Sequence, residues 1–105
     1  MITINIFYPN KPGSRFDMDY YVRTHMPMAF RLLSPALKRA SVEHGLRGEE
    51  DGSPPRYIAM AHLQFESLEK FLEVWLPAAE QLTADIPSYT DIEPVIQISE
   101  VQLSR

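Results

Sequence analysis

Tyr57-Ile-Ala-Met-Ala-His-Leu-Gln-Phe65 is a run of nine residues almost free of charge. In an extended conformation, one side of this run carries Tyr57, Ala59, Ala61, Leu63 and Phe65. The other side carries Ile58, Met60, His62 and Gln64. Because successive side chains of a strand point to opposite faces, the run predicts a strand with substantial apolar surface on both faces.

Three other segments alternate in the same way and are predicted to be strands. They are residues 2–8, 38–46 and 95–103. Two helices are predicted between the strands, beginning after Asp17 and Ser67, because these side-chain oxygens can accept the free N–H groups of a first helical turn. Pro27 and Pro77 interrupt the two helical patterns, since proline has no backbone N–H. We expect the first helix to kink or break near residues 25–27.

The predicted order of elements is strand, helix, strand, strand, helix, strand. This order is typical of the α+β class, and specifically of a ferredoxin-like βαββαβ plait: a four-stranded antiparallel sheet with both helices on one face. A chain of 105 residues has room for one such domain, which would span residues 1–105. Residues 47–56 are polar and carry no apolar anchor, so we expect a mobile loop that contributes little to stability.

Composition excludes several classes of function. The formal net charge is -4, which argues against nucleic acid as a partner, because that binding depends on neutralising phosphates. No cysteine is present, which excludes disulfides and thiolate metal sites. No apolar run reaches the roughly 18 residues of a membrane-spanning helix, and no signal peptide precedes the first strand. We expect a cytoplasmic protein with no membrane partner.

Apolar residues on the predicted second face of the sheet indicate an interface. A face that helices do not cover is normally polar, because it meets water. The simplest cover is the same sheet of a second copy, packed face to face around a two-fold axis. We therefore expect a homodimer, with His62 at its interface; the alternative is scattered surface apolar residues, which are common. The candidates for the apolar contacts are Phe7, Ile58, Met60, Ile96 or Ile98.

Several motifs are shared with a known family. The first group is Tyr8-Pro9, Phe16-Asp17, Tyr20-Tyr21, His25 and Pro27. The later ones are Ala61-His62-Leu63-Gln64-Phe65-Glu66-Ser67-Leu68-Glu69 and Glu93-Pro94-Val95-Ile96-Gln97-Ile98. With these motifs the chain resembles, over essentially its whole length, the EthD-like proteins of the dimeric α/β-barrel superfamily. The resemblance implies a homodimer of ferredoxin-like plaits, a dimeric α/β barrel. Relatives include isomerases, decarboxylases and cyclases of small, often aromatic or lactone compounds, and others have no assigned activity.

His25 is the first candidate for a catalytic residue. It lies four residues after Tyr21, so the two share a helix face that should look toward the sheet. Pro27 leaves the carbonyl of Arg23 free beside it. Imidazole transfers protons near neutral pH, and the hydroxyl of Tyr21 could orient a substrate oxygen or His25 itself. Alternatively, His25 is structural and bonds a nearby carbonyl or Asp, and Tyr21 is an aromatic core residue.

Small side chains in the third strand predict a pocket. Ala59 and Ala61 leave space below the helices, and an apolar pocket with few polar groups is the usual shape of a small-molecule site. Trp75 is a candidate for its wall, and Tyr89 is a candidate for closing its mouth. In the alternative, Trp75 and Phe71 fill the space completely.

His44 is the remaining candidate contact to a substrate. It shares the parity of the residues expected to face the helices, so it could approach His25 from the sheet. The three histidines of the chain show neither His-x-His nor HExxH spacing. We therefore expect no metal site and no cofactor.

Three hypotheses for function follow from these residues. The protein is a cofactor-free enzyme that isomerises, decarboxylates or cyclises a small organic compound by His25-mediated proton transfer. Alternatively, it binds or carries a small hydrophobic metabolite without changing it, for example in a degradation pathway, or it is an accessory subunit of an oxygenase system. A filled space under the helices would favour the last hypothesis, and an open cavity with His25 in its wall would favour the first two.

Overall fold

The computed structural model describes all residues, 1–105, and its elements follow the predicted order. They are β1 (Ile2–Pro9), α1 (Met18–Tyr20), a π-helical turn η1 (Tyr21–His25), α2 (Met26–Leu33), β2 (Arg39–His44), β3 (Tyr57–Phe65), α3 (Leu68–Asp85), a short 3-10 turn η2 (Ile86–Ser88) and β4 (Val95–Glu100). The two helix-capping residues act as predicted. Asp17 accepts the N–H of Tyr20, and Ser67 accepts the N–H of Lys70.

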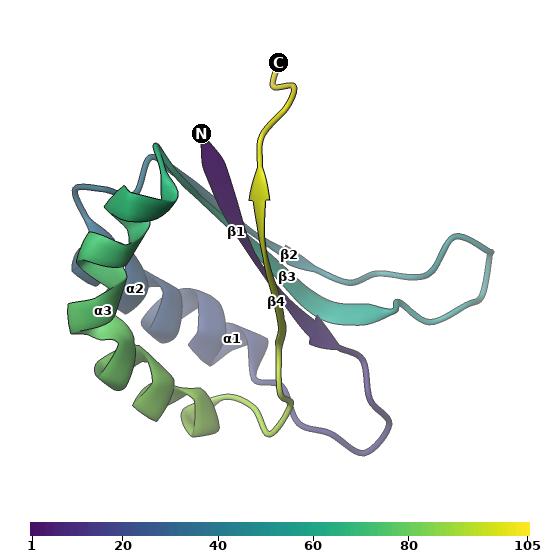
Figure 1. Cartoon of the computed structure of the whole chain (residues 1–105). Helices are drawn as coiled ribbons and strands as arrows, with labels where there is room; N and C mark the ends of the chain where they lie inside the picture. Colours follow the sequence, from purple (N-terminus) through teal and green to yellow (C-terminus); the bar gives the residue numbers. More distant parts are fainter.

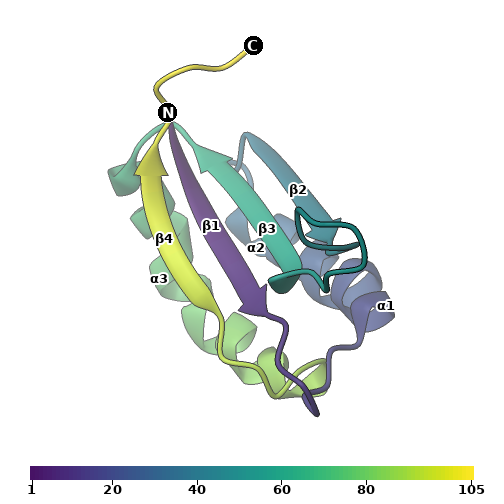
Figure 2. The same ribbon diagram turned by 90° about the vertical axis from the view of Figure 1, so that its right-hand side faces the viewer.

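The four strands form one antiparallel sheet in the order β2-β3-β1-β4. All helices lie on the same side of this sheet (Figure 1), and the opposite face is uncovered (Figure 2). The molecule is therefore a ferredoxin-like α+β plait. No helix combines the length and the apolar character that crossing a bilayer requires.

The core lies between the sheet and the helices. The inward face of β3 is buried from Ala59 to Phe65, as its alternation predicts. The side chains that pack on this face from the helices include Ala29, Leu33 and Phe71.

The first helix absorbs Pro27 without breaking. Because proline has no N–H, the carbonyl of Arg23 receives no bond from it. The backbone instead widens into one π-helical turn, in which the N–H of Met26 donates to the carbonyl of Tyr21. The predicted kink or break near residues 25–27 is therefore an irregularity without a break: the π-helical turn ends at His25, and the chain continues directly into α2.

The second helix also continues through its proline. The sequence predicts an interruption at Pro77, but α3 runs unbroken from Leu68 to Asp85. Pro77 and Glu73, whose carbonyl it leaves unbonded, both lie on the exposed side of the helix. Water can satisfy that carbonyl, so the helix needs no break there.

Strand register corrects the predicted assignment of residues to the two sheet faces. Ile96 pairs with Ile6, and Ile98 pairs with the buried Ile4. Directly paired residues share a face, so both β4 isoleucines look toward the helices and not toward the predicted interface. Ile58 packs against the core too, next to a register shift in the β1–β3 ladder.

The uncovered face of the sheet is consequently more polar than the sequence suggested. It carries Thr3, Asn5, Phe7, Arg39, Ser41, Glu43, Met60, His62, Gln64, Val95, Gln97 and Ser99. Its apolar part is the corner formed by Phe7 with its paired neighbours Met60 and Val95, together with the ring of Tyr57, 5.2 Å from that of Phe7. His62 lies on this face, as its parity predicts.

The loop between β2 and β3 projects beyond the rest of the molecule (Figure 1). Glu49–Gly52 are exposed, and the residues that flank them are joined by a bond from the N–H of Gly48 to the carbonyl of Ser53. We predict that replacing these four residues with Asn-Gly leaves the melting temperature within about 4 °C, because exposed changes cost about 0.5 kcal/mol or less. Thermal melts followed by circular dichroism measure this, and a drop of 10 °C would show that the loop packs on the domain.

Candidate functional site

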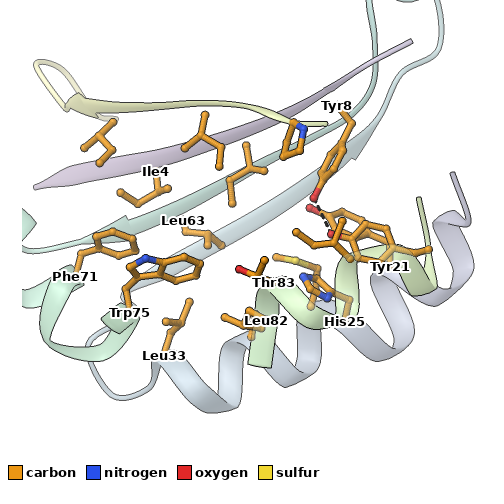
Figure 3. Close-up of a pocket in the computed structure, with 18 of the residues that line it drawn as sticks. Ile4, Tyr8, Tyr21, His25, Leu33, Leu63, Phe71, Trp75, Leu82 and Thr83 are labelled. Carbon is orange, nitrogen blue, oxygen red and sulfur yellow. Dashed lines mark hydrogen bonds between the residues drawn. The ribbon is translucent and has the colours of Figure 1, made fainter. Parts of the chain in front are cut away.

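A cavity of about 330 Å³ lies between the inward face of the sheet and the helices (Figure 3). Sixteen of its nineteen lining residues are hydrophobic, and none is Lys, Arg, Asp or Glu. The lining residues are Ile4, Ile6, Tyr8, Tyr21, His25, Met26, Ala29, Leu33, Leu63, Phe71, Leu72, Trp75, Leu82, Thr83, Ile86, Tyr89, Pro94, Ile96 and Ile98. This volume is in the range of small-molecule sites.

The edge strand β4 marks the entrance to the cavity. Ile96 and Ile98 line the cavity but are 59% and 48% exposed. No strand lies beyond β4 to cover them. A ligand can therefore enter between β4 and α3.

The imidazole of His25 lies in the cavity wall and is paired with a carboxylate. Its Nδ1 is 2.9 Å from Oδ2 of Asp85, the last residue of α3. The other carboxylate oxygen of Asp85 accepts the hydroxyl of Tyr20 at 2.7 Å. The His25 side chain is only 10% exposed and that of Asp85 only 18%. Asp85 therefore fixes the imidazole ring and joins the end of α3 to the first helix.

Asp85 is held in its ionised form. Burial alone raises the pKa of its carboxyl group, but the hydrogen bonds from Tyr20 and His25 outweigh burial and lower the pKa below its ordinary value of 3.8. An ionised Asp85 accepts a hydrogen from Nδ1 of His25 and so leaves Nε2 as the free nitrogen of the ring.

Three tyrosines form a cluster of phenol groups next to this pair, which we call the tyrosine cluster: Tyr8, Tyr21 and Tyr89. The hydroxyls of Tyr8 and Tyr89 share a hydrogen bond of 2.6 Å, and the ring of Tyr21 lies edge-on to that of Tyr8 with centroids 5.7 Å apart. The ring of His25 stacks on Tyr21, with centroids 5.7 Å apart, and contacts Tyr89 at 4.7 Å. All three phenols are buried.

Burial keeps the tyrosine cluster uncharged. Desolvation raises the pKa of all three hydroxyls far enough that none ionises near neutral pH. In Tyr21 and Tyr89 the charge interaction with Tyr8 raises the pKa further, whereas in Tyr8 the bond to Tyr89 opposes part of the effect of burial on the pKa. The cluster consequently offers neutral O–H donors next to a nitrogen that can accept a proton.

Four of the predicted site residues come together around the cavity. Tyr21, His25, Trp75 and Tyr89 all line it. Tyr21 and His25 share the inward side of the π-helical turn, and Trp75 lies in α3. Tyr89 follows η2, at the end of the cavity where Tyr8 reaches down from β1.

Three predicted contacts lie elsewhere. Ala59 and Ala61 are fully buried in the core and do not line the cavity, so the space that small residues leave there is taken up by packing. His44 is exposed at the end of β2. The strand residues of the cavity come from β1, β3 and β4 only, because the cavity lies under that half of the sheet, away from β2.

Sequence reasoning did not identify Asp85, Tyr20 and Tyr8. Asp85 lies 60 residues from His25, and no local spacing connects the two. The position of Tyr8 could have been predicted, because it alternates in phase with Ile4 and Ile6 and so faces the helices.

The EthD domain family model matches residues 14–93 of the chain. The chain belongs to the EthD family. A comparison with curated proteins gave no match.

Solved structures show the same fold. An EthD-like protein from Ralstonia eutropha JMP134 is 41% identical, with a TM-score of 0.95 and coverage of 99% of this chain and 94% of that one. An EthD family protein from Bacillus halodurans C-125 is 14% identical, with a TM-score of 0.67 and coverage of 97% and 99%. A protein of Arabidopsis thaliana is 15% identical, with a TM-score of 0.69 and coverage of 100% and 99%. The last two likenesses concern the fold alone.

The ionised Asp85 makes a pH-dependent contribution to stability. Its pKa is lower in the folded than in the unfolded chain, so the contribution is complete above about pH 4 and is lost as pH falls through the lower folded value. We predict that Asp85→Asn lowers the free energy of unfolding at pH 7 by about 1–2 kcal/mol, since two charge-assisted bonds become neutral ones. Urea titrations should show this difference shrinking as pH approaches 3.

Asp51→Asn is the matched control, because the Asp51 side chain is fully exposed. It should change stability by about 0.5 kcal/mol or less at either pH. A loss in Asp85→Asn that stays constant from pH 7 to pH 3 would contradict the assigned charge.

Proposed function

We propose that this protein is a cofactor-free enzyme that transfers a proton within a small, largely apolar organic compound, as an isomerase, decarboxylase or cyclase of an aromatic or lactone-like molecule does. The observation that carries the proposal is the His25–Asp85 pair in the wall of an open cavity of about 330 Å³. A buried histidine that serves packing alone has no need of such a space beside it.

The pair has the arrangement of a general base with its orienting group. Asp85 accepts the hydrogen of Nδ1, so Nε2 keeps a lone pair with which to take a proton from the substrate. When the imidazole becomes cationic, the 2.9 Å contact with the carboxylate stabilises it. Return of the same proton to another atom of the substrate completes an isomerisation and restores the neutral ring.

The tyrosine cluster supplies the second requirement of such a reaction. Removing a proton leaves negative charge on the substrate, and preorganised O–H donors in a dry cavity stabilise it. The cluster is in direct contact with the His25 ring, through Tyr21 and Tyr89. Base and donors thus lie on the same small region of the cavity wall.

The second candidate function is binding without chemistry. The hydrophobic character of most of the cavity wall favours it, because such a wall suits a carrier of an apolar metabolite equally well. The two functions differ in one observable, which is whether a bound compound exchanges a hydrogen with the solvent.

We also propose that two copies associate through the uncovered sheet face. The apolar corner at Phe7, Met60 and Val95 supports this, because a contiguous apolar patch on a sheet face favours association. His62 lies beside this corner, 5.5 Å from Phe7 by ring centroids, and bonds Asn5 at 2.8 Å.

Proton transfer is tested with small ketones and lactones incubated with the protein in deuterated water. We expect the wild type to accelerate incorporation of deuterium into at least one of them, and His25→Asn to slow it about 100-fold or more, the usual size of a general-base contribution. Nuclear magnetic resonance measures the exchange. His62→Asn is the control, because His62 lies on the other sheet face, and it should keep the wild-type rate. If compounds bind but incorporate no deuterium faster than they do without the protein, the result favours binding without chemistry.

The homodimer is tested by sedimentation velocity at micromolar concentration. We predict a dimer for the wild type and a monomer for Phe7→Glu, because a charge at the centre of the apolar corner cannot be buried without a partner. Leu76→Glu, on the exposed side of α3, should remain dimeric. A wild type that sediments as a monomer would refute the interface.

A further inference from the structure

The two ends of the cavity differ in chemistry (Figure 3). Phe71 and Trp75 lie at one end, with ring centroids 5.9 Å apart. Tyr8, Tyr21 and His25 lie together at the other end. A ligand that fills the cavity therefore has an apolar body toward the first pair and its polar atoms toward the second.

A count of protons in the tyrosine cluster shows that it has a hydrogen bond to give. Its three hydroxyls carry three hydrogens. The hydroxyls of Tyr8 and Tyr89 share one bond, which uses one hydrogen. At least one hydrogen of the cluster therefore has no acceptor within the cluster. Because all three tyrosines line the cavity, this O–H can donate to a molecule in the cavity, and leaving it without an acceptor there is unfavourable.

Charge sets a second limit on the ligand. No Lys or Arg lines the cavity. His25 cannot replace them, because Asp85 is 2.9 Å away and balances the imidazolium when the ring is protonated. An anion in this cavity would lose its hydration without gaining a counter-charge, and this is strongly unfavourable.

We propose, building on the proposed function, that the ligand is an uncharged carbonyl compound, a ketone or lactone, whose carbonyl oxygen accepts a free O–H of the tyrosine cluster while its apolar body packs against the stacked rings of Phe71 and Trp75. Carboxylates and phosphates are excluded, which leaves isomerisation and cyclisation among the proposed reactions. A hydrogen on the carbon next to the carbonyl then lies on the side of His25, whose ring contacts two members of the cluster.

This placement gives a balanced first step. Nε2 of His25 takes the proton, the electrons of the C–H bond form a C=C bond, and the π electrons of the carbonyl move to its oxygen. The resulting enolate oxygen stays bonded to the cluster O–H, where donors stabilise it more than they stabilise the ketone. Reprotonation at another carbon by the imidazolium completes the cycle with no further reactant.

The inference is tested with three probes that share one shape: 2-acetylnaphthalene, its C=CH₂ analogue 2-isopropenylnaphthalene, and the anion 2-naphthoate. Displacement of the neutral fluorescent dye N-phenyl-1-naphthylamine measures their affinities. We expect 2-naphthoate to bind at least about 100-fold more weakly than the ketone. Equal affinity of the ketone and the anion would overturn the exclusion of charged ligands.

The carbonyl contact is tested by comparing the wild type with the triple variant Tyr8→Phe, Tyr21→Phe, Tyr89→Phe. A single replacement is not informative, since two remaining hydroxyls still keep one free hydrogen. Removing all three leaves no partner unpaired, so the fold should survive. We expect the ratio of ketone affinity to alkene affinity to fall about five- to tenfold in the variant. The same two probes are measured on both proteins, so their hydration free energies cancel from the change in this ratio.

Tyr57→Phe is the matched control, because it removes a phenol hydroxyl that lies outside the cavity, beside Phe7. It should leave the affinity ratio unchanged, and a fall in this variant instead would overturn the assignment to the tyrosine cluster. Should the triple variant unfold, the infrared carbonyl band of 2-acetylnaphthalene bound to the wild type decides. A shift below its position in hexane supports the O–H contact, and no shift refutes it.

The outcomes separate this inference from the proposed function. Binding of both neutral probes with an unchanged affinity ratio would leave the cavity a ligand site and refute only the carbonyl contact. Binding of neither probe, nor of the dye, would refute the proposed function and the inference together.

Discussion

Strand β1 hydrogen-bonds to two strands at once, and this double pairing sets the faces of most of the sheet. Its inward face carries Ile4, Ile6 and Tyr8. Because paired residues share a face, β1 turns Leu63 of β3 and Ile98 of β4 toward the helices as well. The floor of the cavity is assembled by this register from three separate segments of the chain.

The carboxylate of Asp85 connects the end of α3 to the first helix. Asp85 receives bonds from Tyr20 and His25, so the end of α3 is tied to the first helix at the place where proton chemistry is possible. The π-helical turn beside Pro27 contributes to the same site, because it stacks the rings of Tyr21 and His25 with an interplanar angle of 14°. Local backbone irregularities of this kind are frequent at functional sites.

The electrostatics of the site favour one kind of chemistry. A neutral, largely apolar wall with a single base and an O–H donor can move a proton and stabilise charge on oxygen. The wall offers an anion no counter-charge, because the carboxylate of Asp85 balances the His25 imidazolium. These side chains, and not the fold, are the grounds for proposing an uncharged substrate with an acidic C–H.

Features that depend on neighbouring residues could be predicted from the chain alone. Alternation identified the four strands, Asp17 and Ser67 began the helices, and the spacing of Tyr21 and His25 placed them on one inward face. These features follow from the two-residue period of strands and the geometry of a helical turn, which act over a few residues. The order of elements, βαββαβ, predicted the antiparallel sheet with both helices on one face.

Contacts between residues that are far apart in the chain could not be predicted in this way. The parity of β4 was ambiguous, because exposed edge strands do not alternate clearly, and pairing with β1 turned Ile96 and Ile98 to the cavity. His44 could not be excluded before the cavity was known to lie away from β2. Asp85 meets His25 across 60 residues, and the Tyr8–Tyr89 bond spans 81. Contacts at such separations arise from the packing of whole elements, and no local spacing in the chain encodes them.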